Sequence, residues 1–189
     1  MLPSGNRRKA VFLDRDGVIN RATVRNGKPY PPDSLELLEI LPGVQQSLVA
    51  LHAAGYLNIV VTNQPDISTG KQTRDVLQSM HRMLAEKLAI DDFRICTHVD
   101  ADRCDCRKPA PGMILGAAAK WNIDLSTSYM VGDRWRDIAA GQSVGCGCFF
   151  IDYSYDEKCP ELPYRQVKSL SEAARIILSP EITQARVGK

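Results

Sequence analysis

The stretch Ala10-Val11-Phe12-Leu13-Asp14-Arg15-Asp16-Gly17 decides the fold, because an apolar run is followed at once by two aspartates. Four consecutive apolar residues between polar ones predict a short buried strand. In an open parallel sheet, ligands bind beyond the carboxyl ends of the strands. The stretch therefore predicts both a core strand and a polar site at its end.

The same alternation of short apolar runs and longer periodic segments continues along the chain. It predicts strands at residues 57–61, 93–97, 128–131 and 148–151, and helices at 44–51, 76–88, 113–121, 136–142 and 171–178. Strands that alternate with helices are typical of a parallel sheet covered on both faces. We therefore predict a doubly wound, Rossmann-like α/β fold in one domain (residues 1–189), with the proline-rich segment 21–41 passing over the active face.

Composition excludes several classes of protein. The chain has 189 residues, 44% of them hydrophobic, and a net charge of +2, as is typical of one soluble domain with a sizeable core. Because basic and acidic residues are interleaved, no nucleic-acid partner is expected. No apolar stretch reaches the roughly 18 residues of a membrane-spanning helix, and no secretory leader pattern fits. We expect a cytoplasmic monomer with no membrane partner.

Polar residues also follow two further predicted strands. Thr62-Asn63-Gln64 follows the second strand, and Gly132-Asp133-Arg134 follows the fourth. Because parallel strand ends meet at one edge of the sheet, the carboxylates should converge there. Such a cluster needs a cation, and oxygen ligands favour Mg²⁺. The sequence therefore predicts a magnesium site formed by Asp14, Asp16 and Asp133.

Two aspartates separated by one residue suit phosphoryl transfer. Asp14 can attack phosphorus to form an aspartyl-phosphate while Asp16 moves a proton, and Mg²⁺ neutralises charge between the carboxylate and the phosphoryl group. Thr62 and Asn63 offer hydrogen-bond donors, and Lys108 offers a compact positive charge before a predicted helix. Each feature alone also fits a surface turn or a solvated lysine. Their occurrence together, each after its predicted strand, favours a phosphatase site.

Four segments, FLDRDGVIN (12–20), VTNQ (61–64), CRKP (106–109) and MVGDR (130–134), resemble the motifs of the haloacid dehalogenase (HAD) superfamily phosphatases. The resemblance implies that Asp14 is the nucleophile and that Asp16 is the general acid and base, its backbone carbonyl also binding Mg²⁺. It further implies that Asp133 binds the metal, that Asp137 supports the site, and that no large cap domain is present. The residues expected to contact phosphate or substrate are Thr62, Asn63, Gln64, Arg107, Lys108 and Arg134.

Cys96, His98, Cys104 and Cys106 place four metal-binding side chains within eleven residues. Three thiolates and one imidazole suit tetrahedral Zn²⁺, and a site filled by four protein ligands is closed and structural. Such a zinc loop would hold the basic residues 107–108 over the end of the sheet. Reduced cysteines in an ordinary loop are the alternative.

The remaining cysteines and histidines do not lie at ligand spacing. We interpret Cys146, Cys148 and Cys159 as thiols of the core, and His52 and His81 as ordinary helix residues.

The zinc loop followed by CRKP resembles a narrower subgroup, the histidinol-phosphate phosphatases and the D-glycero-D-manno-heptose 1,7-bisphosphate phosphatases. Segments 17–20, 70–73, 108–113 and 128–133 are more similar to the heptose enzymes. The five-residue gap within the zinc loop is instead similar to the histidinol-phosphate branch. Pro65-Asp66 matches neither pattern.

The charge of the substrate adds a physical criterion. A second phosphate group would need cations at the mouth of the site, for which Arg107, Arg134, Arg136 and Lys71 are candidates, whereas an aminoalcohol would need a carboxylate. We therefore favour hydrolysis of heptose 1,7-bisphosphate to the 1-phosphate. Histidinol-phosphate hydrolysis and a non-catalytic, zinc-stabilised binding module are the alternatives.

Overall fold

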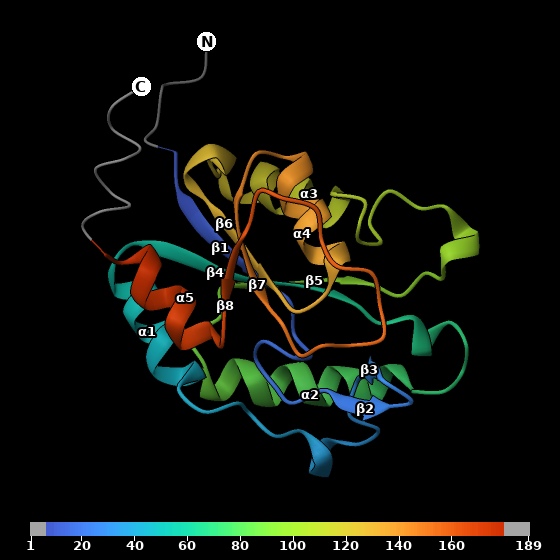
Figure 1. Ribbon diagram of the computed structural model, residues 1–189. Helices are drawn as coiled ribbons and strands as arrows, with labels where there is room; N and C mark the ends of the chain where they lie inside the picture. The colour runs from blue at the N-terminus through green and yellow to red at the C-terminus, as the bar shows by residue number, and fades with distance from the viewer. Residues whose placement is uncertain (1–6, 180–189) are drawn as a thin grey trace.

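A six-stranded parallel sheet forms the centre of the computed structural model, which describes residues 7–179. Its strands are β1 (Lys9–Leu13), β4 (Tyr56–Asn63), β5 (Asp92–Cys96), β6 (Tyr129–Gly132), β7 (Gly147–Ile151) and β8 (Arg165–Val167). The spatial order is β5-β4-β1-β6-β7-β8, and every neighbouring pair is parallel (Figure 1). The chain thus turns to either side of the central β1, which is the arrangement that places a ligand site at the ends of β1 and its neighbours.

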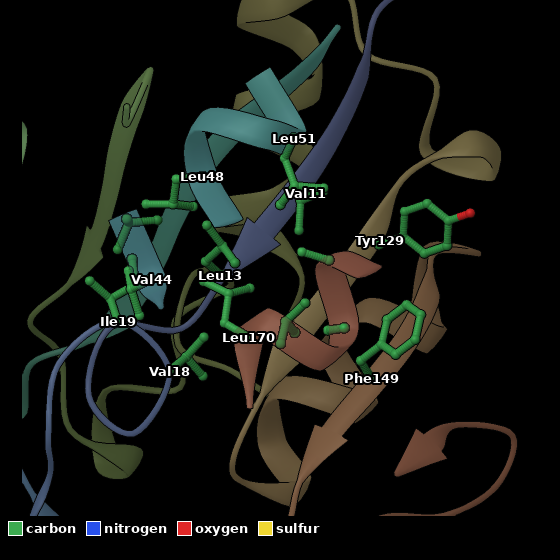
Figure 2. Close-up of a cluster of buried hydrophobic side chains, with 14 of the residues drawn as sticks. Val11, Leu13, Val18, Ile19, Val44, Leu48, Leu51, Tyr129, Phe149 and Leu170 are labelled. Carbon is green, nitrogen blue, oxygen red and sulfur yellow. The ribbon is translucent and has the colours of Figure 1, made fainter. Parts of the chain in front are cut away.

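Both faces of the sheet are apolar because side chains alternate along each strand. In β1, Val11 and Leu13 belong to one buried cluster, and Ala10 and Phe12 to another on the opposite face. Figure 2 shows the first cluster, where Val11 and Leu13 meet Leu48 and Leu170. A strand that is buried on both faces reads as a continuous apolar run, which explains the Ala10–Leu13 signal.

Within residues 7–179, five helices cover the two faces of the sheet. They are α1 (Val44–Ala53), α2 (Arg74–Lys87), α3 (Gly112–Trp121), α4 (Trp135–Ser143) and α5 (Leu170–Ile177). Helices α1, α2 and α5 bury apolar residues in the first cluster, and α3 and α4 bury theirs in the second (Figure 1). Short 3₁₀ turns span Leu35–Leu37, Pro65–Ile67, Asp100–Asp102 and Leu125–Thr127. The predicted doubly wound α/β fold without a large cap is confirmed.

Two elements differ from the sequence prediction. Strand β8 was not predicted, since its three residues carry no apolar run. The segment 21–41 contains a small antiparallel hairpin, β2 (Thr23–Arg25) and β3 (Lys28–Tyr30), which forms a sheet of its own. The expectation of one domain over residues 1–189 includes residues that lie outside the described range. Among the described residues, no helix is long and apolar enough to cross a membrane.

Candidate active site

The carboxyl ends of β1 and β6 bring three buried carboxylates together. Asp14 follows β1, Asp133 follows β6, and Asp137 lies in the first turn of α4; their oxygens lie within 4.8 Å of one another. The buried Lys108 joins two of them, because its Nζ lies 2.7 Å from Asp14 Oδ1 and 2.6 Å from Asp137 Oδ1. Nζ also donates to the carbonyl of Val61 at 2.6 Å, so the ammonium group is fixed by three acceptors.

The electrostatics of this cluster call for a divalent cation. Burial, reinforced by Asp137 and Asp16 and opposed by Lys108, raises the pKa of Asp14 to about 6. Burial and the neighbouring Asp14 hold the pKa of Asp133 well above its usual value. Three carboxylates facing one ammonium group leave two negative charges in excess when all are ionised. The donor set therefore fits Mg²⁺, a hard ion that prefers oxygen ligands.

Asp133 supplies independent support for a metal ligand role. Within residues 7–179, both of its carboxylate oxygens are buried without a partner at hydrogen-bond geometry, and the Tyr155 hydroxyl lies nearby. A buried carboxylate without donors is costly unless a cation satisfies it. Gly17 leaves room for this side chain: its φ is +89°, and a Cβ there would lie 1.9 Å from Asp133 Oδ2.

Asp16 is held by three side chains from two segments of the chain. Oδ1 accepts from Arg15 and from Asn20, the latter at 2.9 Å. Oδ2 accepts from Arg15 at 2.9 Å and from Gln64 at 2.8 Å. The turn that carries Arg15, Asp16 and Asn20 is closed by a 2.7 Å backbone hydrogen bond from Gly17 to Asn20. Asp16 consequently has a fixed orientation at the edge of the site.

The three polar residues predicted after the second strand have different surroundings. Thr62 and Gln64 are buried, and Gln64 donates to the Thr62 hydroxyl at 2.9 Å. The Asn63 amide exchanges two hydrogen bonds with the backbone of Lys108, both at 3.1 Å. Asn63 thus fixes the backbone that carries the ammonium group.

One cavity is lined by carboxylates of the site and by Lys108. Asp14, Asp16, Lys108 and Asp137 line it from the sheet, and Lys28 and Tyr30 line it from the β2–β3 hairpin. Further lining residues are Asn63, Asp66, Arg134, Arg136 and Glu157. The expectation that segment 21–41 passes over the active face is confirmed, and the hairpin contributes a basic residue that the sequence did not single out.

Of the four basic residues expected at the mouth of the site, two line the cavity and two do not. Arg134 and Arg136 line the cavity, where Arg134 also pairs with Glu157. Arg107 lies outside the lining and donates to the Asp100 carboxylate and the His98 carbonyl. Lys71 is exposed and also lies outside it.

The four predicted zinc ligands converge. Cys96, at the end of β5, lies with Sγ 3.6 Å from His98 Nδ1, 3.7 Å from Cys104 Sγ and 3.0 Å from Cys106 Sγ. Cys106 Sγ lies 3.3 Å from His98 Nδ1 and 3.4 Å from Cys104 Sγ. Sulfur ligands of tetrahedral zinc are about 3.8 Å apart, so the cluster is close to that geometry. Three thiols and one imidazole fit Zn²⁺ better than a hard cation.

The loop that carries this cluster is connected to the cavity through Asp100. The Asp100 carboxylate accepts from Arg107 at 2.8 Å and from Arg136 at 3.0 and 3.2 Å. Arg136 lines the cavity. The placement of the loop therefore affects a cation that faces the substrate space.

The remaining cysteines and histidines only partly follow the sequence interpretation. Cys146 and Cys148 are buried, as predicted, but the prediction for Cys159 was wrong: it is exposed, in a polar loop after β7. His52 is half-exposed near Asp91. His81 is buried and contacts Arg15, a connection that helical periodicity alone does not predict.

A parallel sheet with a lysine-bridged pair of carboxylates at its carboxyl edge defines a hydrolase of the HAD-like class. A family model described as HAD-hydrolase-like matches residues 105–172. A D-glycero-beta-D-manno-heptose-1,7-bisphosphate 7-phosphatase of Rhodopseudomonas palustris is 38% identical over 157 residues, covering 77% of this chain and 84% of that protein. The enzyme of the same name from Vibrio cholerae is 37% identical over 150 residues, covering 73% and 77%.

A solved structure agrees with these relatives. The D,D-heptose 1,7-bisphosphate phosphatase of B. bronchiseptica, complexed with magnesium and phosphate, has a TM-score of 0.78 and 28% identity, covering 90% of this chain and 98% of that one. The chain belongs to the HAD-like phosphatase family that contains these enzymes, and it is a phosphoric monoester hydrolase. Because the relatives in this family are phosphatases, the alternative interpretation as a non-catalytic, zinc-stabilised binding module is not supported.

Proposed function

We propose that this protein hydrolyses D-glycero-D-manno-heptose 1,7-bisphosphate to heptose 1-phosphate and inorganic phosphate. The observation that carries the proposal is the cavity in which Asp14 and Lys108 lie at the floor while Lys28, Arg134 and Arg136 lie around the walls. The floor suits the transferred phosphoryl group, and the walls suit a second anionic group on the same small molecule. The names of the relatives support this substrate.

In the proposed mechanism, Asp14 attacks phosphorus and the bond to the sugar oxygen breaks. Lys108 occupies Asp14 Oδ1 at 2.7 Å, which leaves Oδ2 to form the aspartyl-phosphate. Asp16 protonates the departing sugar oxygen and then takes a proton from the water that hydrolyses the aspartyl-phosphate. Asn63 lines the cavity, and its amide holds the backbone of Lys108, whereas Thr62 is buried outside the lining.

Mg²⁺ would be held by the carboxylates of Asp14 and Asp133 and by the backbone carbonyl of Asp16. When bound, it neutralises charge between the carboxylate and the phosphoryl oxygens. Asp137 pairs with Lys108 instead and keeps the ammonium group in place. Zn²⁺ in the Cys96, His98, Cys104 and Cys106 cluster would stabilise the loop without taking part in the reaction.

Asp14, Asp16, Lys108 and the basic residues of the cavity all come from one chain, and we propose a monomeric enzyme that acts as one domain. Thiolate ligands for zinc and six free cysteines support a reducing compartment such as the cytoplasm.

Histidinol phosphate is the second candidate substrate, and Asp66 is the observation that favours it. Asp66 lines the cavity, and its side chain forms no hydrogen bond or ion pair within residues 7–179. A free carboxylate beside the leaving group would attract the ammonium group of an aminoalcohol and repel a second phosphate.

Replacing Asp66 by asparagine should change kcat/KM in opposite directions for the two candidate substrates. Asp66→Asn should raise kcat/KM about 3- to 10-fold for heptose bisphosphate, because removing a like charge near a dianion is worth about 1 kcal/mol at a solvated site. For histidinol phosphate the same change should lower kcat/KM by a similar factor. Asp75→Asn, an exposed carboxylate at the start of α2 away from the cavity, is the control.

The proposal requires a clear preference of the parent enzyme in the same assay. Phosphate release from both substrates would be measured with Mg²⁺ present. A kcat/KM for histidinol phosphate that exceeds the value for heptose bisphosphate would overturn the proposed substrate in favour of the second candidate. Phosphate release by Asp14→Asn at the parental rate would overturn the mechanism for both.

A further inference from the structure

Arg15 lies between the two catalytic aspartates in the sequence but never reaches the substrate cavity. Its side chain is completely buried. Nε and Nη2 donate to Asp16 Oδ1 at 3.1 and 3.0 Å, and Nη2 also donates to Asp16 Oδ2 at 2.9 Å. A guanidinium group in this fork arrangement fixes the plane of a carboxylate as well as its position.

His81 supplies the acceptor on the opposite side of Arg15. It projects from α2, and its Nε2 lies 3.2 Å from Arg15 Nη1. Its ring stacks on Phe93 of β5, with centroids 4.7 Å apart and an interplanar angle of 25°. Because a guanidinium group only donates hydrogen bonds, Nε2 must accept, and the ring proton lies on Nδ1.

The chemistry of the pocket keeps His81 in that acceptor form. Burial, with the charge of Arg15, lowers the pKa of His81 to about 3. The imidazole is consequently neutral throughout the physiological range. The buried Arg15 thus has a neutral acceptor for Nη1 on one side and a carboxylate for Nε and Nη2 on the other, so both sides of the guanidinium are satisfied.

Hydrogen bonds from three side chains restrict the orientation of the Asp16 carboxylate. Asn20 donates to Oδ1 and Gln64 donates to Oδ2, while Arg15 donates to each of them. Among the residues that the structure describes, only Arg15 contacts both oxygens. A shift of Arg15 would therefore turn the whole carboxylate, whereas loss of either amide would free one oxygen.

We propose that Arg15 and His81 are positioning residues for Asp16: His81 fixes the guanidinium group of Arg15, and Arg15 orients the Asp16 carboxyl group toward the leaving oxygen. The inference rests on the proposed role of Asp16 as the group that protonates that oxygen. It extends the site by two buried residues that line no part of the cavity.

The leaving group of the substrate provides a specific test. A sugar alkoxide leaves only with a proton from the enzyme, whereas p-nitrophenolate leaves readily without one. Misplacing the proton donor should therefore reduce kcat/KM for an alkyl phosphate more than for p-nitrophenyl phosphate. Because kcat/KM covers the steps through aspartyl-phosphate formation, the later hydrolysis does not affect the comparison.

His81→Phe retains the stacking on Phe93 and removes the acceptor. We expect it to lower the ratio of kcat/KM for the heptose bisphosphate to that for p-nitrophenyl phosphate about 10-fold, a part of the 10²- to 10⁴-fold that a positioned proton donor contributes. Arg15→Lys, which keeps the charge but loses the fork, should lower the same ratio. His81→Gln, whose side-chain carbonyl can accept from Arg15, should restore it.

Leu77→Val is the matched control, since Leu77 is buried on the same helix one turn earlier and makes no polar contact with Arg15. It should leave the ratio at the parental value. An unchanged ratio in both His81→Phe and Arg15→Lys, or an equal fall in Leu77→Val, would overturn the inference. Phosphate release by Asp14→Asn at the parental rate would instead overturn the proposed function, so the two failures are distinguishable.

Discussion

Replacing Asp14 by asparagine should abolish turnover and yet stabilise the metal-free protein at neutral pH. The variant lacks the nucleophile, so we expect a fall in kcat of at least about 10³-fold. It also lacks one of the three buried carboxylates that repel one another around Lys108. Function and stability should therefore change in opposite directions.

The pKa of Asp14 sets the size of the stability effect. The folded value of about 6 compares with 3.8 for the unperturbed group, a difference equivalent to about 3 kcal/mol. A carboxyl group with a raised folded pKa contributes stability below pH 3.8, and that contribution is lost as the pH rises to about 6. Asparagine does not titrate, so the variant avoids this loss. For a chain of this size, the gain corresponds to a Tm higher by about 6–12 °C at pH 7.5.

Thermal and urea unfolding of chelator-treated proteins between pH 4 and pH 8 would measure the effect. The stability difference between Asp14→Asn and the parent should be small at pH 4 and grow up to pH 7. Excess Mg²⁺ should shrink it at pH 7.5, because the metal stabilises the ionised parent. Asp75→Asn should show no such pH dependence. A variant that is less stable than the parent at pH 7.5 without metal, or a difference that does not vary with pH, would refute the reasoning.

Three further substitutions test other parts of the site. Gly17→Ala places a Cβ 1.9 Å from Asp133 Oδ2, and should raise the Mg²⁺ concentration for half-maximal activity more than about 10-fold; unchanged Mg²⁺ dependence would contradict the metal assignment. Lys108→Met leaves Asp14 and Asp137 unpaired, and should cost about 3–5 kcal/mol in urea unfolding at pH 7.5, more than at pH 5. Cys106→Ser should reduce bound zinc well below one ion per chain and lower Tm; full zinc content by elemental analysis would exclude the cluster as the site.

The positions of Asp14 and Asp133 could be predicted because they depend only on strand order and direction. Each follows a strand that is apolar on both faces, and parallel strands end at one edge whatever their loops do. The convergence of the Cys/His cluster was predictable for a similar reason, since Cys96 ends β5 and the other three residues lie in the loop that follows, so few long-range contacts are needed.

The partners of long charged side chains could not be predicted in this way. Arg107 has the reach to face the phosphate, but in the fold it meets Asp100, whose carboxylate lies on the same loop. Arg15 is completely buried although an isolated arginine is usually exposed, and one of its acceptors, His81, comes from a helix 66 positions further along the chain. The β2–β3 hairpin escaped prediction because three-residue strands, one with a proline, give no alternating pattern.

In the proposed function, that hairpin places part of the substrate-facing wall on a different element from the catalytic groups. Asp14, Asp133 and Lys108 are held by the six-stranded sheet and its buried clusters, where a substitution risks the whole fold. Lys28 and Tyr30 belong to a two-stranded sheet of their own and line the cavity from outside the central sheet. Mutations in the hairpin can therefore accumulate at little cost to folding. Over evolutionary time, the same catalytic floor can be given a new substrate by changing only a few exposed residues.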